Sequence, residues 1–131
     1  MFTVLNADFH RDDETNIVTD NTTSLQWQDD AVGSTMKWQE AIDYCENTLT
    51  LGNYSDWRLP NKKELLSIVD YSKYGPSIDS QFQNTTLSYY WSSTTHANDT
   101  GNAWIVNFND GYTGYYTKDN NRYVRCVRSG Q

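Results

Sequence analysis

The apolar residues between positions 38 and 49 repeat with the period of an α-helix, and they constrain the fold of this 131-residue chain more than any other stretch. Five of them fall at positions i, i+3, i+4, i+7 and i+11: Trp38, Ala41, Ile42, Cys45 and Leu49. Thr35 is a suitable N-cap before them, and Gly52 ends the segment after them. The spacing therefore predicts an amphipathic helix that points Cys45 into the core.

A second helix is predicted after Pro60. Asn61 is a good N-cap residue, and Glu64 three positions later completes a capping-box pair that satisfies free backbone amides. Its apolar stripe consists of Leu65, Leu66, Ile68 and Val69. The turn-forming residues 72–76 indicate that this helix ends near Tyr71.

The segments on either side of these helices are typical of β-strands. Residues 16–20 and 24–28 predict a hairpin with a polar turn, in which Leu25 and Trp27 share one buried face. Residues 77–88 lack periodicity and predict an irregular loop anchored to the core by Ile78 and Phe82. After that loop the sequence is β-prone to its end.

Three strands are predicted in this last part, at Tyr89–Trp91, Ala103–Phe108 and Tyr123–Val127, with a hairpin turn at Asp110-Gly111. Helices followed by strands predict the α+β class. The length fits one domain, which we place at residues 16–131. Residues 1–15 are predicted to be a polar lead-in with a short strand near Phe2 to Leu5, and its charged run from Arg11 to Glu14 is not expected to be buried.

Charge and hydropathy exclude two classes of partner. The formal net charge of −7 argues against nucleic acid and against anionic lipid surfaces. No stretch approaches ~20 consecutive apolar residues, so no membrane insertion is expected, and Met1 to Leu5 is too short for a signal peptide. A secreted parent that has lost its leader and a cytosolic protein both remain open on this point.

The two cysteines, Cys45 and Cys126, are too far apart for a CxxC redox motif and too few for a Cys-rich metal site. If they pair, the bridge closes a loop of about 80 residues and contributes roughly 4–5 kcal/mol in the chain-entropy model. A bridge of this kind would favour an oxidising compartment.

A series of short motifs resembles a known family. In order along the chain they are Asp20, Leu25-Gln26-Trp27-Gln28, Trp38-Gln39-Glu40-Ala41-Ile42 with Cys45, Asp56-Trp57-Arg58-Leu59-Pro60, Glu64-Leu65, Tyr90-Trp91-Ser92-Ser93-Thr94, Ala103-Trp104 and Tyr123-Val124-Arg125-Cys126-Val127-Arg128. Together they resemble the C-terminal domain of the Legionella collagen-like adhesin, over residues 16–128.

This resemblance implies a variant of the C-type lectin-like fold, in which two helices flank a small, twisted, mainly antiparallel sheet and long loops form a ligand surface. It also implies a disulfide between the first helix and the last strand, here Cys45 with Cys126. The family's setting implies an extracellular, cell-surface or periplasmic location, with any homo-oligomer formed through a longer parent chain.

The motif residues themselves are predicted to be scaffold. Trp57 and Leu59 are expected in the core, with Arg58 bound to a carboxylate or to backbone carbonyls. Ser92 and Ser93 would need a histidine base to act as nucleophiles, and no Gly-x-Ser-x-Gly elbow is present. We therefore predict that the protein is not an enzyme. An oxidase similar to the formylglycine-generating enzymes, a distant relative of the fold, is the enzymatic alternative and would need reactive cysteines.

No metal or other cofactor is predicted. Many lectin-like domains bind calcium through Glu-Pro-Asn and Trp-Asn-Asp runs, and this chain has neither. Asn98-Asp99 and Asn107 to Asp110 offer oxygen ligands of the kind that calcium uses, so a calcium site is the alternative to ordinary turn chemistry.

The region 96–123 is the predicted ligand-binding surface. Tyrosine gives a large contact area at small entropic cost and asparagine gives adaptable hydrogen bonds, which is the chemistry of binding loops, although Asn and Gly also simply make turns. The candidate residues are His96, Asn98, Asp99, Asn102, Trp104, Asn107, Asn109, Tyr112, Tyr115, Tyr116, Asn120 and Asn121.

The predicted partner is a glycan or protein ligand on another cell or surface. The resemblance to the adhesin implies a glycosaminoglycan-like polyanion, which the net charge of −7 disfavours unless Lys118, Arg122, Arg125 and Arg128 form a local basic patch. A retroelement-diversified display protein of a phage or bacterial surface is an alternative, because the Asn, Tyr, Asp and Thr bias between Trp91 and Arg128 is compatible with adenine-directed mutagenesis.

Overall fold

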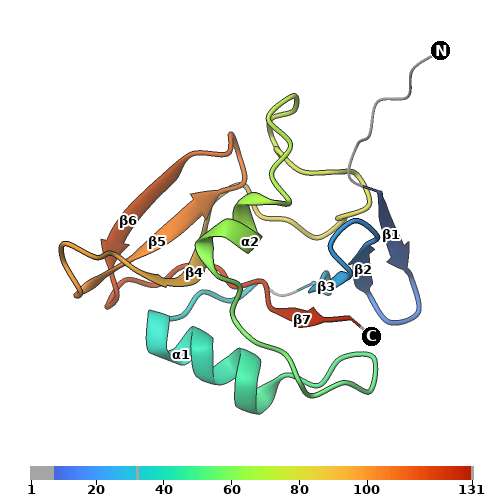
Figure 1. The fold of residues 1–131 in the computed structure, drawn as a ribbon, viewed down its shortest axis with the longest axis horizontal. Helices are drawn as coiled ribbons and strands as arrows, with labels where there is room; N and C mark the ends of the chain where they lie inside the picture. The colour runs from blue at the N-terminus through green and yellow to red at the C-terminus, as the bar shows by residue number, and fades with distance from the viewer. Residues whose placement is uncertain (1–7, 32, 131) are drawn as a thin grey trace.

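The computed structural model describes residues 8–31 and 33–130, so the predicted strand near Phe2 to Leu5 lies outside the described residues. The chain forms two antiparallel sheets and two short helices, which confirms the α+β class (Figure 1). In place of the single sheet expected, one sheet has the order β1-β2-β3-β7 and the other β4-β5-β6. The elements are β1 (Phe9–Asp12), β2 (Ile17–Asp20), β3 (Leu25–Gln28), α1 (Trp38–Asp43) continued by a π-helical turn η1 (Tyr44–Thr48), α2 (Lys62–Leu66), β4 (Tyr89–Thr95), β5 (Asn102–Asn107), β6 (Thr113–Thr117) and β7 (Val127–Ser129).

The first helix forms where the apolar period predicts it, but it begins later. Thr35 was the predicted N-cap, and the structure has Lys37 there instead. The backbone N–H of Lys37 donates to the Glu40 carboxylate at 2.9 Å, so the carboxylate satisfies an amide that a threonine hydroxyl was expected to satisfy. Ala41 and Cys45 are fully buried, as the spacing predicts.

The second helix begins as predicted and ends early. Asn61 Oδ1 accepts from the N–H of Glu64 at 2.7 Å, and Glu64 accepts from the N–H of Asn61 at 2.9 Å, which confirms the capping box. The helix ends at Leu66 rather than near Tyr71. After Leu66 the Ser67 hydroxyl donates to the Glu64 carbonyl, and Val69 beyond it forms a β-bridge with Ile78.

Arg58 is bound to a carboxylate, as predicted, and this pair gives the stability of the fold a pH dependence. Its guanidinium donates two bonds of 2.7 Å to Glu64, which lowers the pKa of the Glu64 carboxyl below its ordinary value of 4.5. A lowered folded-state pKa means that the pair stabilises the fold fully above the ordinary value. That contribution is lost as the pH falls through the folded-state pKa.

Replacing Glu64 by glutamine is therefore expected to lower the free energy of unfolding by at most about 1 kcal/mol at pH 7, because the pair is partly exposed. Glutamine can still accept the capping bond from Asn61, so the change isolates the charge. Urea unfolding at pH 7 and pH 3 checks this, since the difference from wild type should be smaller at the lower pH. An equal difference at both values would mean that the charge of Glu64 is not responsible.

The core consists of two clusters that meet along the motifs identified from sequence. One contains the apolar face of α1 together with Trp57, Leu59 and Trp91. The other lies beneath α2 and contains Tyr90, Val127 and the following buried side chains: Val18, Trp27, Leu65, Ile68, Ile78, Phe82, Val106 and Phe108. The predicted loop anchors Ile78 and Phe82 are confirmed, and so are the predicted core positions Trp57 and Leu59.

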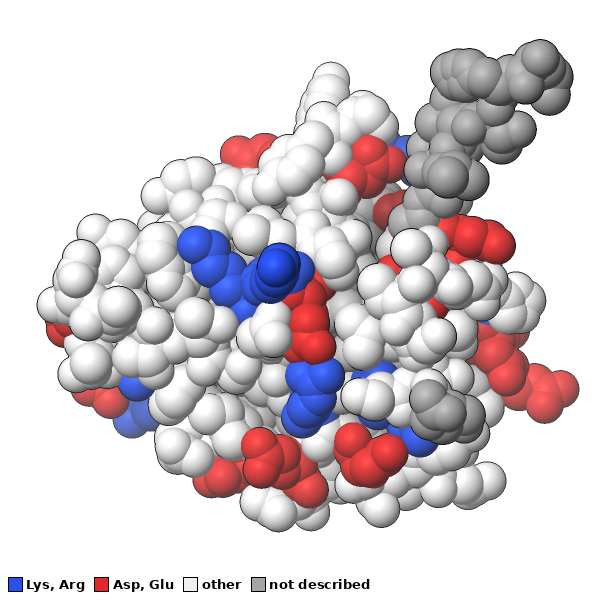
Figure 2. Space-filling view, viewed as in Figure 1, with Lys and Arg blue, Asp and Glu red and all other residues white. Residues whose placement is uncertain are grey.

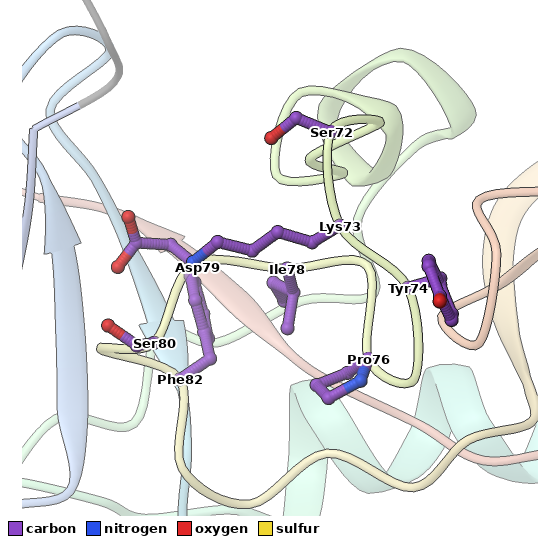
Figure 3. A pocket seen from close by; sticks show the side chains of 8 residues that line it. All are labelled: Ser72, Lys73, Tyr74, Pro76, Ile78, Asp79, Ser80 and Phe82. Carbon is purple, nitrogen blue, oxygen red and sulfur yellow. The ribbon is translucent and has the colours of Figure 1, made fainter.

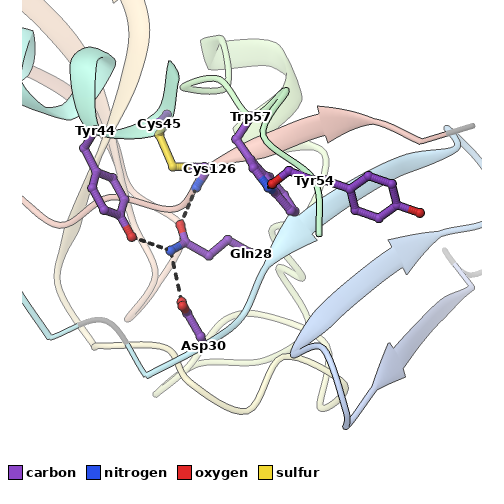
Figure 4. The surroundings of a disulfide bond; sticks show 7 residues. All are labelled: Gln28, Asp30, Tyr44, Cys45, Tyr54, Trp57 and Cys126. Carbon is purple, nitrogen blue, oxygen red and sulfur yellow. Dashed lines mark hydrogen bonds between the residues drawn. A yellow bond between two sulfur atoms is a disulfide. The ribbon is translucent and has the colours of Figure 1, made fainter. Parts of the chain in front are cut away.

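The disulfide between Cys45 and Cys126 joins the end of the first helix to the segment before β7, as the family resemblance implied. Gln28 connects the same region by hydrogen bonds (Figure 4). Its side-chain oxygen accepts from the N–H of Cys126 at 2.9 Å, and its amide nitrogen donates to the Tyr44 hydroxyl at 2.9 Å. Both sulfur-bearing residues are fully buried, so the bridge lies inside the core.

A buried carboxylate joins both ends of the described chain. The side chain of Asp29 is fully buried, and its two oxygens accept from Arg11 Nε at 2.8 Å and Arg125 Nη1 at 2.9 Å. The same oxygens accept from the backbone N–H groups of Gln83 and Asn84. Arg11 was expected to be exposed, and that prediction is wrong because β1 pairs with β2 and carries Arg11 toward Asp29.

The last predicted strand is also displaced. Tyr123–Val127 was expected to be one strand, but regular pairing is confined to β7, which lies beside β3. Tyr123 instead forms a single parallel bridge with Tyr90, and Val127 bridges Arg58. This segment crosses between the two sheets, so its residues bond to each sheet in turn. Within the described residues, no helix has the length and apolar character needed to cross a membrane.

Candidate functional site

The sheet β4-β5-β6 has one face against α1 and another that α2 covers only in part (Figure 1). Side chains alternate between these faces along each strand. Ala103 and Ile105 on β5 are buried in the core cluster that contains α1. Trp104 lies between them in sequence and is on the other face of the sheet. Its cross-strand neighbour on that face is Tyr115 on β6. The alternation of side chains along the strands therefore decides which predicted site residues lie together on the exposed face.

Three of the predicted residues form a contiguous aromatic platform: His96, Trp104 and Tyr115. The rings of His96 and Tyr115 are stacked, with centroids 3.9 Å apart. Trp104 meets Tyr115 edge to face at 5.2 Å. Tyr115 is 48% exposed, so the platform presents an aromatic ring to solvent on a strand held by the sheet. Figure 2 shows that the face over β5 and β6 carries mostly uncharged side chains.

A cation and a shallow hollow adjoin the platform at the start of α2. Lys62 Nζ lies 3.5 Å from the ring centroid of Trp104, a cation–π contact. The backbone N–H of Lys62 donates to the Thr94 hydroxyl at 2.9 Å, which fixes the start of the helix against β4. A hollow of about 460 Å³ lies beside it, lined by Asn61, Lys62, Lys63, Leu66 and Thr94. The apolar part of this lining comes from Leu66 and the lysine stems.

The predicted asparagines and aspartate lie at the two ends of the sheet. The first of these ends adjoins the platform, because the N–H of His96 donates to the carbonyl of Asn102 at 2.9 Å and the N–H of Asp99 donates to the carbonyl of His96 at 3.3 Å. Asn102 and Asn107 begin and end β5, a separation of about 17 Å at the usual rise per residue. Asn98 and Asp99 belong to the turn before β5, and Asn109 to the turn after it. Asn120 and Asn121 lie at the first of these ends, because the N–H of Lys118 donates to the carbonyl of Gly101.

Most of the polar side-chain atoms in these turns accept or donate hydrogen bonds within the same turn. Asp99 accepts from the N–H of Gly101 at 3.2 Å and from the side-chain amide of Asn102 at 3.3 Å. Asn107 accepts from the N–H of Asn109 at 2.9 Å, and Asp110 from the N–H of Tyr112 at 3.0 Å. These contacts are ordinary turn chemistry, the alternative that the composition left open.

The two remaining predicted tyrosines lie elsewhere. Tyr116 is on the opposite face of the sheet from Tyr115, where it stacks on Tyr89 at 5.3 Å beneath the guanidinium of Arg122. Tyr112 is 52% exposed at the turn before β6. The region 96–123 thus supplies one aromatic cluster on one face of the sheet. The other predicted site residues lie in the turns or on the opposite face.

Sequence reasoning missed three groups that the fold brings beside these residues. Lys62 had no sequence signal beyond its place after a helix cap. Tyr71, near which the second helix was predicted to end, is 69% exposed, and Tyr74, in the predicted turn, is 85% exposed. The N–H of Gly75 donates to the carbonyl of Asn109, so their loop lies against the turn that follows β5.

The loop that connects α2 to β4 also lines a shallow hollow of about 440 Å³ (Figure 3). Its lining consists of Ser72, Lys73, Tyr74, Pro76, Ile78, Asp79, Ser80 and Phe82. Ile78 and Phe82 are buried core residues that form its floor. The hollow belongs to a loop without regular structure, unlike the platform, whose Trp104 and Tyr115 stand on paired strands.

Among residues 8–31 and 33–130, no group of three or more His, Cys, Asp or Glu side chains is placed to hold a metal ion. Ser92 is fully buried and its hydroxyl donates to the carbonyl of Trp104 at 2.8 Å. Its role in the fold is therefore to join β4 to β5.

Comparison with known proteins supports the resemblance identified from sequence. The family model described as the Lcl C-terminal domain matches residues 16–128. This match covers most of the chain, including both helices, the disulfide and the aromatic platform. None of the curated proteins compared matches the chain.

Proposed function

Because the chain belongs to the Lcl C-terminal domain family, we propose that it is a non-enzymatic binding module whose aromatic platform receives a glycan or protein ligand. The observation that carries this proposal is the exposed Tyr115 ring, held by His96 and Trp104 on a paired strand. Rigid, partly exposed aromatic rings suit the apolar face of a sugar or an apolar side chain of a protein.

The fold is proposed to be a variant of the C-type lectin-like fold. Support comes from two helices packed on small antiparallel sheets, and from a disulfide between the first helix and the segment before the last strand. We place the protein outside the cytoplasm, at the cell surface or in the periplasm, since disulfides persist in oxidising compartments.

The absence of enzymatic activity is part of the proposal. The chain has two cysteines, and both are in the disulfide, whereas the oxidase alternative needs reactive thiols. We propose that binding needs no cofactor, because Asp99 and Asp110 each accept bonds within their own turns. The ligand would then be held by aromatic contact, by Lys62 and by nearby polar groups.

Replacing Tyr115 by alanine is expected to weaken ligand binding about tenfold, equivalent to about 1.4 kcal/mol, because it removes the exposed ring of the platform. Arrays of glycans and host proteins with wild type identify the ligand, and titration of the bound ligand gives the change in affinity. Tyr74→Ala is the matched control, since it removes an even more exposed tyrosine elsewhere.

Equal binding by wild type and Tyr115→Ala would contradict the placement of the site on the platform. An equal loss of affinity in Tyr74→Ala would indicate non-specific binding through exposed tyrosines instead of a defined site. Circular dichroism of both variants should match wild type, because both side chains lie at the surface.

A further inference from the structure

Arg122 is the one arginine that no carboxylate pairs with among residues 8–31 and 33–130. The Nε atom of its guanidinium is buried and has no hydrogen-bond partner in this part of the chain. A guanidinium carries several N–H donors and keeps its charge, so an unpaired and half-buried one is available to an acceptor from outside the chain. The other arginines are each bound to a carboxylate: Arg11 and Arg125 to Asp29, Arg58 to Glu64 and Arg128 to Asp56.

Aromatic rings and backbone bonds hold Arg122 in place. Its guanidinium carbon lies 4.7 Å from the ring centroid of Tyr116 and 5.1 Å from that of Tyr89, and these two rings stack on each other. The backbone N–H of Arg122 donates to the carbonyl of Met36 at 3.0 Å, and the N–H of Met36 donates to the carbonyl of Arg122 at 2.9 Å. A guanidinium held over aromatic rings is pre-organised, so less entropy is lost when its planar fork of donors binds a ligand.

A third tyrosine, Tyr112, extends this cluster toward solvent. Gly114 and Tyr116 share one face of β6, because side chains alternate along a strand. A methyl group at Gly114 would lie 2.9 Å from the Tyr112 ring, so glycine leaves the room in which that ring lies across the strand. The Tyr112 side chain is 52% exposed. Tyrosine and arginine are enriched at the centres of protein–protein interfaces, so this face has the composition of a binding surface for a protein.

The neighbouring cations do not join Arg122 in a basic patch. Lys118 Nζ lies over the ring of Trp38, 3.9 Å from its centroid, and donates to a threonine hydroxyl on β4. Arg125 and Arg128 are buried in their ion pairs. The patch suggested by the sequence therefore reduces to one guanidinium without an acceptor. A polyanion gains affinity with each cation that it neutralises, whereas a single guanidinium matches a single planar carboxylate through two parallel bonds.

We propose that Arg122 and the tyrosines around it form a second binding site, which takes an aspartate or glutamate side chain of a partner protein. The carboxylate accepts two N–H bonds from the guanidinium, and Tyr112 and Tyr116 contact apolar atoms beside it. A protein fits better than a charged polysaccharide, because one cation meets one carboxylate and the surrounding side chains are tyrosines. The site lies on the opposite face of the sheet from Tyr115, so it does not depend on the proposed ligand of the platform.

Titration of the wild-type protein with acetate, at constant ionic strength, tests the preference for a carboxylate. The side-chain N–H signals of Arg122 in nuclear magnetic resonance spectra, assigned through its backbone amide, are expected to shift and saturate. Those of Arg58 are the matched control and should need at least about tenfold more acetate, because Glu64 occupies that guanidinium with two bonds of 2.7 Å. Acetamide, which has a similar shape without the charge, should leave the Arg122 signals unshifted. Signals that do not saturate, or a higher affinity for sulfate than for acetate, would overturn the proposal.

A library of random peptides tests whether the carboxylate belongs to a protein. Peptides that bind wild type but not Arg122→Lys, which keeps the charge and loses the planar fork, are expected to contain Asp or Glu. Exchanging that acid for Asn or Gln should weaken binding to wild type at least about tenfold. Tyr115→Ala should bind these peptides as wild type does, whereas Arg122→Lys should keep ligand binding at the platform.

Three results of the selection contradict the proposal: no peptide that depends on Arg122, full affinity after the acid is exchanged, or equal weakening by Tyr115→Ala. The last would place the peptides on the platform. The backbone bonds between Arg122 and Met36 do not involve the arginine side chain, so Arg122→Lys is expected to fold. If it does not, the acetate titration of wild type decides the matter alone.

Discussion

Replacing Asp29 by alanine is expected to lower the free energy of unfolding by about 3–5 kcal/mol, the usual cost of breaking a buried ion pair. Asp29 is fully buried and accepts from two guanidiniums, those of Arg11 and Arg125, which are themselves buried. Its loss leaves both cations in the interior without a buried carboxylate. It also frees the two backbone N–H groups that its oxygens satisfy.

Chemical denaturation of purified protein measures this effect, with Asp13→Ala as the matched control. Asp13 also contacts Arg11, but its side chain is 79% exposed, so its removal should cost less than about 1 kcal/mol. If Asp29→Ala does not fold, Asp29→Asn keeps the size of the side chain and tests the charge alone. Equal stability of Asp29→Asn and wild type would show that the carboxylate charge is not needed.

Removing the disulfide is expected to have an effect of similar size. The sequence separation of 81 between Cys45 and Cys126 gives about 4.5 kcal/mol in the chain-entropy model, and measured losses for native disulfides are about 2–5 kcal/mol. The expected result is a lower denaturation midpoint for wild type unfolded in the presence of a thiol reductant than in its absence.

The Cys45→Ala, Cys126→Ala double variant is the control, because its midpoint should not respond to the reductant. Equal midpoints for wild type with and without reductant would contradict the expected contribution. Arg125 is the neighbour of Cys126, so the losses from the disulfide and from Asp29 should not add when combined.

Features that depend on neighbours in sequence were predictable. The capping box of Asn61 and Glu64 needs only residues three positions apart, and the structure confirms it. The end of the same helix was not predictable, because Val69 leaves it to bridge Ile78, a partner nine positions away across an irregular loop. The burial of Arg11 depends likewise on Asp29, a contact that local sequence does not reveal.

In the candidate site, too, features set by local sequence were predictable and features set by tertiary contacts were not. Trp104 and Tyr115 share a face because they lie directly opposite each other on the two strands that the predicted Asp110-Gly111 turn connects. Because side chains alternate along a strand, Tyr116 lies on the opposite face from Tyr115. Composition alone had placed both tyrosines in one binding surface. Lys62 reaches Trp104 only because α2 packs on the sheet, and that packing is a tertiary property.

The disulfide also determines how the domain carries mechanical load. A pulling force between Phe9 and Ser129 passes along β1, β2, β3 and the first helix to Cys45, then crosses the sulfur bridge to Cys126 and β7. Residues 46–125 lie inside the covalent loop and are bypassed by this path. Strands β4, β5 and β6, with the aromatic platform, therefore lie outside the covalent path of the force while the chain ends are under tension.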